Sequence, residues 1–242
     1  MNCLPIPDDV SDDKALYLSD ILPTAYHGCD IGKVGKGSIV AIWGLGPIGL
    51  LQARWCQILG AQRIIGIDCV PERLQIAREQ LKIDTIDFHE VDTTTKLLEM
   101  VPGGVDCSLE AAGFDYAKSF LHRLELFLQL ETDAGDILSE MIKCTRKAGT
   151  ISIIGVYNNT VNHFPIGPMM EKHLTIVGGQ SYTQKHWKFC LDKIRSGEID
   201  PSFIVSHRLT LSQVPDYYRQ FNKKQGGALK CFVRPEGFID KQ

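Results

Sequence analysis

Apolar residues along this chain gather in short runs that alternate with longer amphipathic stretches. The first clear run, Ser38–Trp43 (SIVAIW), is apolar and rich in β-branched residues, which predicts a strand buried on both faces. Before it, Ser11–Cys29 carries leucine, isoleucine and tyrosine at helical intervals and predicts a helix that is broken near Pro23. A strand with no polar face implies a sheet covered by helices on both sides.

The alternation of short strands and helices continues along most of the chain. The predicted strands after Trp43 are Arg63–Asp68, Thr85–Phe88, Val105–Ala111, Thr150–Val156 and Leu174–Gly179, and the predicted helices are Ile48–Leu59, Pro71–Leu81, Lys96–Met100, one ending near Lys147 and Gln184–Arg195. Strand and helix in regular succession predict right-handed crossovers and a parallel sheet. The expected fold class is therefore α/β, with a doubly wound, six-stranded Rossmann sheet.

This pattern also predicts the organisation of the chain. Residues 29–205 form the sheet domain, and residues 114–135 are too many for a simple crossover, which predicts a surface insertion. The insertion mixes apolar and charged residues at helical spacing, so a solvated helix and a contact with a partner or substrate both stay open. Residues 1–28 and 206–242 flank the domain.

Composition and charge narrow the function. The net charge is −3 and no block of lysine or arginine forms a stripe, which argues against nucleic acid as a partner. No apolar stretch reaches the ~18 residues of a membrane span, and the acidic start does not resemble a secretory signal. The eight cysteines include no CxxC pair, which favours reduced thiols and a cytoplasmic location over disulfides or a zinc knuckle.

The candidate chemistry begins where the first strand gives way to a helix. The turn Gly44-Leu45-Gly46-Pro47-Ile48-Gly49 has the spacing GxGxxG. Gly44 allows the tight turn, Gly46 lets the backbone approach a pyrophosphate, and Gly49 lets helix and strand pack closely. The helix N-terminus offers free N–H groups to the phosphates. The turn predicts binding of a dinucleotide.

Asp68 ends the next predicted strand, about 20 residues after the turn, where a carboxylate can accept hydrogen bonds from the adenosine ribose hydroxyls. The same charge would repel a 2′-phosphate by more than an exposed Arg73 repays, so NAD is favoured over NADP. Methyl-donor nucleotides and FAD share the layout, but Trp43 replaces the acidic residue that the former usually require, and FAD normally uses the first strand of the chain. The alternative is a packing turn with Asp68 as a helix cap.

At this point the chain resembles the zinc-dependent medium-chain alcohol dehydrogenases, and within them the glutathione-independent formaldehyde dehydrogenase-like branch. The matching segments are SDILPTAYHG, WGLGPIG, IDCVPER, LETD, RKAGTISIIGVY, NHFPIG, EIDPSF and GGALK, which span almost the whole chain. The resemblance implies hydride transfer between an alcohol or aldehyde hydrate and NAD, with zinc polarising the substrate oxygen.

The resemblance also carries over residue roles. It places Gly44, Gly46, Gly49 and Asp68 at the cofactor and Arg73 near the adenosine ribose. By the same comparison, Ala112, Gly113, Gly155 and Val156 would line the nicotinamide side, and Lys230 would approach the pyrophosphate.

For zinc, Asp20 matches the third ligand of the family, and its alternative role is a helix N-cap. Relatives carry an N-terminal lobe before the SDILPT segment, with the Cys and His that complete the zinc site. This sequence has 19 residues before Asp20, so the resemblance implies that residues 1–28 and 206–242 are remnants of a catalytic domain whose main lobe we expect to be missing. A catalytic zinc needs about three protein ligands. Isolated histidines later in the chain do not replace them, so we expect the chain alone to be incomplete for catalysis.

Two structural expectations follow from the missing lobe and the resemblance. Leu16, Leu18, Phe232 and Val233 would be exposed or loosely held. The sixth strand is a sheet edge, and the family's pairing at that edge predicts a homodimer.

Three functions therefore compete. The first is the NAD-binding portion of a zinc-dependent alcohol or aldehyde dehydrogenase. The second is a non-enzymatic NAD(H)-binding or regulatory subunit. The third is a zinc-free enzyme of the quinone reductase type, against which Asp68 argues because those relatives usually favour NADP.

Overall fold

The computed structural model describes residues 2–113, 135–158, 160–222, 226–235 and 237. The chain divides into two compact units: a sheet unit, Ala25–Ser181, and a terminal unit made of Met1–Thr24 and Tyr182–Gln242. The sequence analysis placed the boundaries after residues 28 and 205 instead. The predicted insertion at 114–135 falls, except for Gly135, outside the described residues.

The sheet unit is built on six parallel strands in the order β3-β2-β1-β4-β5-β6. The strands are β1 (Ile39–Trp43), β2 (Arg63–Asp68), β3 (Asp84–Asp87), β4 (Val105–Glu110), β5 (Thr145–Ile153) and β6 (Thr175–Gly178). The strand order reverses between β1 and β4, as in Rossmann folds, and β6 forms one edge. The predicted six-stranded, doubly wound sheet is confirmed, and ligands of such sheets bind at the carboxyl ends of the strands beside this reversal.

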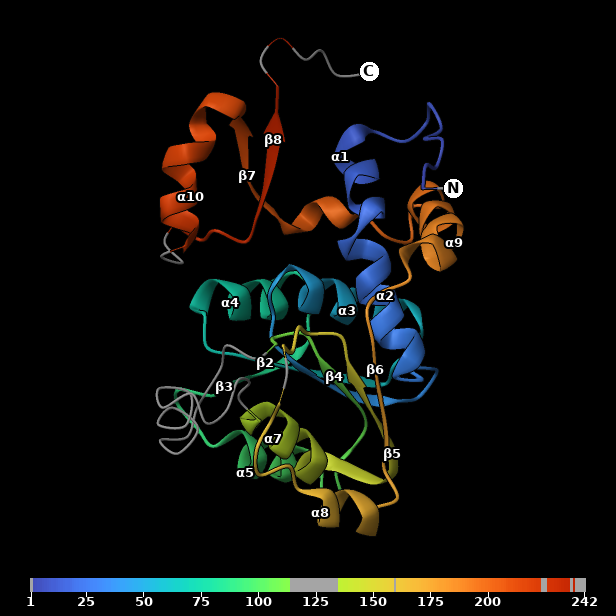
Figure 1. The fold of residues 1–242 in the computed structure, drawn as a ribbon, viewed down its shortest axis with the longest axis vertical. Coiled ribbons are helices and arrows are strands. Elements are labelled where there is room, and N and C mark those ends of the chain that lie inside the picture. Colours follow the sequence, from blue (N-terminus) through green and yellow to red (C-terminus); the bar gives the residue numbers. More distant parts are fainter. Residues whose placement is uncertain (1, 114–134, 159, 223–225, 236, 238–242) are drawn as a thin grey trace. The chain divides into compact units, whose positions relative to one another are not determined.

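Helices cover both faces of the sheet. The helices that connect or follow its strands are α3 (Pro47–Ile58), α4 (Pro71–Glu79), α5 (Thr93–Met100), α7 (Asp136–Cys144) and α8 (Ile166–Glu171). Figure 1 shows α3 and α4 on one face and α5 and α7 on the other. The central strands are buried along nearly their whole length, because both faces contact helices. Among the described residues, none of the helices has the length and apolar character needed to cross a membrane.

The helix predicted to end near Lys147 ends at Cys144, and β5 begins at once. The Lys172 Nζ donates to the carbonyl oxygens of Ile142 (3.0 Å) and Lys143 (2.6 Å), which a helix continuing to Lys147 would use internally, and so favours the earlier end. Ala148 has φ +58°, which an α-helix does not allow.

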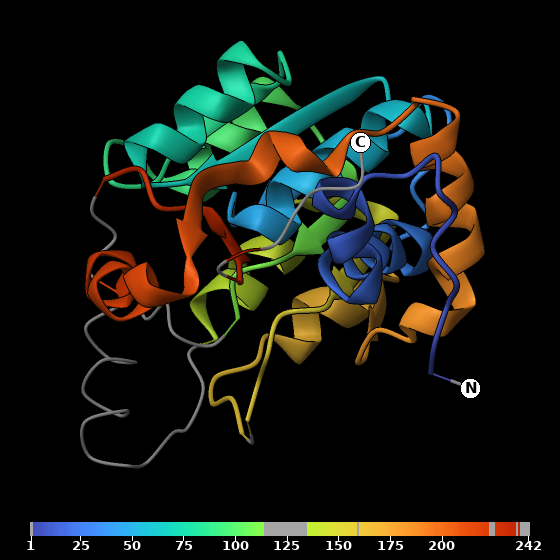
Figure 2. The same cartoon turned by 90° about the horizontal axis from the view of Figure 1, so that it is seen from above.

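The terminal unit has a different construction. It contains α1 (Asp12–Ala15), the 3-10 turns η1 (Leu16–Ser19), η2 (Pro201–Ile204) and η3 (Leu211–Gln213), helices α9 (Thr183–Arg195) and α10 (Val214–Asn222), and strands β7 (Val205–Thr210) and β8 (Lys230–Arg234). The two strands form a separate parallel pair. The blue N-terminal segment and α9 lie side by side in both views (Figures 1 and 2), and η1 contacts α9.

Helix α2 (Ile21–Ile31) runs from the terminal unit into the sheet unit, and it corrects one prediction. The break in the N-terminal helix lies at Asp20, whose φ/ψ of −153°/−85° is not helical, and not at Pro23. Pro23 sits in the first turn of α2, where a missing N–H removes no helical hydrogen bond.

The expected exposure of four apolar residues in the terminal unit is half correct. Leu16 is 49% exposed and Val233 36% exposed, but Leu18 and Phe232 are buried. The guanidinium groups of Arg208 and Arg234 lie 5.5 and 5.0 Å from the Phe232 ring centroid. The unit therefore covers Phe232 with its own arginine side chains.

Candidate nucleotide site

The glycine turn lies at the carboxyl end of β1, beside the point where the strand order reverses. Gly44 follows Trp43 with φ +94°, a conformation that glycine adopts without steric cost. Gly46 is the N-cap of α3, Pro47 fills the first helical position, and Ile48 follows it. The N-terminus of α3 therefore opens at the carboxyl edge of the sheet, as the sequence predicts.

The two later glycines differ in what surrounds them. A Cβ on Gly49 would lie 1.8 Å from the carbonyl oxygen of Gly44, so the turn and the helix pack without room for any side chain. A Cβ on Gly46 would meet no atom within 4 Å. Gly49 is thus required by packing, whereas Gly46 borders open space into which a ligand could come close to the backbone.

Asp68, at the end of β2, holds this turn together. It is 4% exposed. Its Oδ2 accepts a hydrogen bond from the N–H of Leu45 at 2.7 Å, and its Oδ1 accepts from the N–H groups of Cys69 (2.7 Å) and Val70 (2.9 Å). A carboxylate offers about four acceptor positions, so a ribose hydroxyl would take the one that these three bonds leave, which the Arg73 guanidinium approaches to 3.5 Å. The N-cap of α4 is Val70, without a side-chain cap bond, so Asp68 holds the residues before that helix and does not cap it. Its ribose role stays a prediction.

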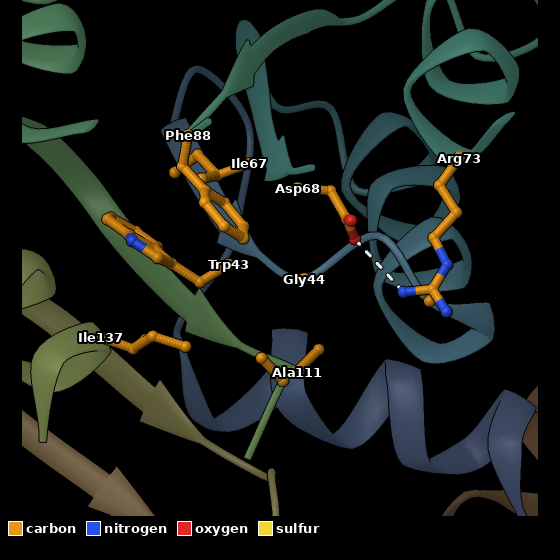
Figure 3. Close-up of a pocket in the computed structure, with 10 residues that line it drawn as sticks. Trp43, Gly44, Ile67, Asp68, Arg73, Phe88, Ala111 and Ile137 are labelled. Carbon is orange, nitrogen blue, oxygen red and sulfur yellow. Dashed lines mark ion pairs between the residues drawn. The ribbon is translucent and has the colours of Figure 1, made fainter. Parts of the chain in front are cut away.

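A pocket of about 210 Å³ opens beside this carboxylate. Its volume is below the ~300 to 1,000 Å³ of complete ligand pockets, which suits one part of a dinucleotide. The lining residues are Trp43, Gly44, Gly46, Ile67, Asp68, Arg73, Phe88, Ala111, Ala112 and Ile137. Figure 3 shows Trp43, Ile67 and Phe88 near one another on one side of Gly44, with Asp68 and Arg73 on the other.

Arg73 is more enclosed than the sequence analysis assumed. Its side chain is 19% exposed, and its Nη1 lies 3.5 Å from Asp68 Oδ2 (Figure 3). The guanidinium thus lies beside the carboxylate that is predicted to bind the adenosine ribose, near which the resemblance placed Arg73. Its Nε is buried without a hydrogen-bond partner in the structure.

Glu110, at the end of β4, is a residue that the sequence analysis missed. It is fully buried, and its Oε1 accepts from the N–H groups of Ala112 (2.6 Å) and Gly113, while Oε2 accepts from that of Gly155 (2.8 Å). Burial raises the pKa of Glu110, although the three N–H groups oppose the rise. The available signal was an acid at the end of the strand segment VDCSLE, directly before Ala-Ala-Gly.

The residues expected on the nicotinamide side lie in two turns that touch. A Cβ on Gly113 would meet the carbonyl oxygen of Val156 at 3.1 Å, and Glu110 links Gly113 to Gly155. Ala112, however, lines the same pocket as Asp68 and Arg73. The nicotinamide role of these residues stays a prediction.

The two remaining predicted residues belong to the terminal unit. Lys230 is the first residue of β8. Asp20 immediately precedes α2, and its Oδ1 accepts a hydrogen bond from the Thr24 hydroxyl at 3.1 Å. Within the described ranges, no three His, Cys, Asp or Glu side chains form a group that could hold a metal ion. The described residues therefore do not fit a zinc site, whereas the Gly44 turn and Asp68 do fit a dinucleotide.

The fold and this site together define a Rossmann-type domain with its glycine turn at the reversal of strand order. Comparison with known proteins extends this result, although no protein-family model matches the chain. A zinc-type alcohol dehydrogenase-like protein of Schizosaccharomyces pombe is 45% identical over 96% of this chain and 55% of its own length. The glutathione-independent formaldehyde dehydrogenase of Pseudomonas aeruginosa is 38% identical over 58% of this chain and 34% of its own length.

Solved structures agree. The alcohol dehydrogenase of Thermus sp. ATN1 is 30% identical, with a TM-score of 0.81 over 96% of this chain and 60% of that one. The relatives of this chain are thus zinc-type medium-chain alcohol dehydrogenases, formaldehyde dehydrogenases among them, which confirms the resemblance. The chain spans little more than half the length of the S. pombe relative.

Proposed function

We propose that this chain is the NAD(H)-binding portion of a zinc-dependent alcohol or aldehyde dehydrogenase of the formaldehyde type. The observation that carries the proposal is the joint placement of the Gly44 turn and Asp68 at one pocket. Gly46 leaves space for a pyrophosphate at the N-terminus of α3, and Asp68 lies where it can accept a ribose hydrogen bond. Bound NAD would accept a hydride from the alcohol carbon.

Asp68 also supports the choice of NAD over NADP. A 2′-phosphate beside its nearly buried carboxylate would meet a like charge. Arg73 offsets this little, because its guanidinium already lies 3.5 Å from the same carboxylate. We therefore expect binding of NADH to exceed that of NADPH by tenfold or more, about 1.4 kcal/mol.

Calorimetric titration with NADH and NADPH tests the assignment in wild type, Asp68→Ala and Asp87→Ala. Asp87 is the control because it also ends a strand and accepts a backbone N–H, from His89 at 2.9 Å, yet it does not line the pocket. Asp68→Ala should weaken NADH binding by about 1 to 3 kcal/mol. It should also reduce the preference for NADH, which a loss of structure alone would not do. Equal NADH affinity in wild type and Asp68→Ala would refute the ribose role.

A second candidate is a non-enzymatic NAD(H)-binding or regulatory subunit. It requires only the nucleotide pocket formed by the Gly44 turn and Asp68, without metal chemistry. Alcohol and formaldehyde turnover assays with added zinc separate the two. Nucleotide binding without turnover would support the regulatory role, and zinc-dependent turnover would exclude it.

We also propose a homodimer formed through β6 and a cytoplasmic location. Strand β6 is an edge of the sheet and its residues are partly or fully exposed, which leaves its outer backbone groups available for pairing. The eight cysteines are free thiols, typical of a reducing compartment. A monomer at micromolar concentration in light scattering would count against the dimer.

A further inference from the structure

Glu110 is a buried acid that the proposed function has not yet used. Among the described residues its carboxylate accepts from three backbone N–H groups and forms no ion pair with lysine or arginine. Burying a carboxylate is costly unless its hydrogen bonds are satisfied. An apolar side chain would fill the same space, but it would leave the N–H groups of Ala112, Gly113 and Gly155 without an acceptor.

The local backbone is built around this carboxylate. Gly113 has φ +81°, and a Cβ on Gly155 would lie 2.2 Å from Glu110 Oε2. Both glycines therefore provide the close backbone approach that the hydrogen bonds require. We call Glu110 and the N–H groups of Ala112, Gly113 and Gly155 the Glu110 brace.

The brace is connected to the nucleotide pocket on one side. The N–H of Ala111 donates to the carbonyl oxygen of Trp43 at 2.9 Å, and a Cβ on Gly44 would lie 3.2 Å from the carbonyl of Ala111. Ala111 and Ala112 line the pocket of Asp68. The Oε1 bonds of Glu110 thus fix the pocket wall, while the Oε2 bond fixes the turn at Gly155 and Val156.

We propose that Glu110 is a positioning residue whose two carboxylate oxygens align separate parts of the dinucleotide site. Oε1 sets the wall beside the adenosine half through Ala112, which the resemblance assigned to the nicotinamide side but which lines the pocket of Asp68. Oε2 sets the turn at Gly155, which the resemblance assigns to the nicotinamide half. The inference rests on the proposed binding of NAD(H), and it adds the residue that couples the two halves.

Glu110→Gln separates the two oxygens. Glutamine keeps one acceptor oxygen and replaces the other by an NH₂ donor. The glutamine oxygen should take the Oε1 position, because two backbone N–H groups donate to Oε1 and one donates to Oε2. The NH₂ group then faces the N–H of Gly155, so one arm of the brace stays and the other is broken.

The experiment is calorimetric titration of wild type and Glu110→Gln with NADH and with AMP, which lacks the nicotinamide half. We expect AMP affinity within about twofold of wild type and NADH affinity about tenfold lower, because NADH must then order a turn at Gly155 that the carboxylate no longer holds in place. Unchanged NADH affinity, or an equal loss for both ligands, would overturn the inference. Wild type binding neither ligand would instead refute the proposed function.

Asp106→Asn is the matched control for loss of stability. Asp106 lies on the same strand, β4, and accepts the N–H of Ile39 at 2.7 Å, but it does not line the pocket. Asp106→Asn should lower the stability of the protein and leave its affinities for AMP and NADH unchanged. Should Glu110→Gln fail to fold, amide exchange in the wild type decides: slow exchange at Gly113 and Gly155 is expected, and exchange at unprotected rates would contradict the brace.

Discussion

The sheet unit and the terminal unit are stabilised in different ways. In the sheet unit the central strands are buried on both faces, and an apolar cluster that includes Trp43 and Met141 fills one side. In the terminal unit β7 alternates between partly buried and exposed positions, and Asp13 joins α1 to Arg208 and Arg234 on the strand pair. Burial of apolar area is worth about 25 cal/mol per Å², whereas exposed ion pairs add 0 to 1 kcal/mol each.

We therefore expect the terminal unit to open at lower denaturant concentration than the sheet unit. Hydrogen exchange followed by mass spectrometry resolves the two, because peptides from β1 and β2 report on one unit and peptides from β7 and β8 on the other. The substitutions below should change the difference in stability between the two units, and they are given in order of decreasing expected effect.

Gly49→Ala should reverse the order of stability. The new Cβ would lie 1.8 Å from the Gly44 carbonyl oxygen, and both atoms belong to rigid elements, so the cost to the sheet unit is about 3 kcal/mol or more. Urea unfolding with exchange detection measures it. Gly46→Ala is the control, because its Cβ meets no atom within 4 Å. It should cost less than about 1 kcal/mol in stability and still weaken NADH binding. Similar stability losses in both variants would show that the turn is not packed as described.

The same contrast explains what the sequence could predict. The central strands of the sheet unit were found because strands buried on both faces read as continuous apolar runs. The edge strands β3 and β6 are partly exposed, and their short β-branched runs were found between predicted helices. Strands β7 and β8 were missed, because VSHRLT and KCFVR carry mixed patterns and their pairing joins segments separated by α10. The local pattern of apolar and polar residues carries no information about the pairing of β7 with β8, which are far apart in the sequence.

At the site, the sequence located the residues whose spacing carries information. Gly44, Gly46, Gly49 and Asp68 follow a fixed motif, so they could be found without a structure. Glu110 could not, because its role depends on Gly155, which lies on another turn of the fold. The burial of Arg73 likewise depends on its approach to Asp68 in three dimensions.

Asp13→Asn should widen the difference in stability between the two units, because it weakens the terminal unit. Asp13 forms ion pairs with Arg208 and, at 2.8 Å, with Arg234. Loss of the charge should cost about 2 kcal/mol, a typical value for hydrogen bonds to charged groups. Exchange in β7 and β8 should rise while exchange in β1 and β2 stays constant. Asp12→Asn, at the preceding position in α1, is the control and should change neither.

The ion pairs of Asp13 with Arg208 and Arg234 also make the terminal unit sensitive to acid. Partial burial raises the pKa of Asp13, but hydrogen bonds from Arg234 and Arg208 outweigh it and hold the pKa below its usual value. The stabilisation is therefore present above the unfolded pKa of about 3.9 and is lost as the pH falls through the lower folded pKa. Asp13→Asn should remove that part of the pH dependence. A variant that keeps the full acid sensitivity would exclude Asp13 as its source.

Lys172→Met should narrow the difference in stability between the two units by about 1 kcal/mol, because it removes hydrogen bonds from the sheet unit. Lys172 Nζ donates to carbonyl oxygens at the end of α7, where such groups have no helical partner. Exchange in α7 should increase. Lys147→Met removes an exposed lysine from β5 and should have no comparable effect. Equal protection of α7 in wild type and Lys172→Met would show that this cap contributes nothing.

Arg195→Gln should have the smallest effect, less than about 0.5 kcal/mol. Arg195 Nε lies 2.9 Å from Asp9 Oδ2, but the side chains are 49% and 54% exposed, so water and salt screen the pair. The exchange rates of the terminal unit should match those of the wild type within error, at low and high salt alike. A loss as large as that of Asp13→Asn would mean that the terminal unit depends on the number of its ion pairs. A null result would locate its polar stabilisation at Asp13, where one carboxylate joins two arginines of the strand pair.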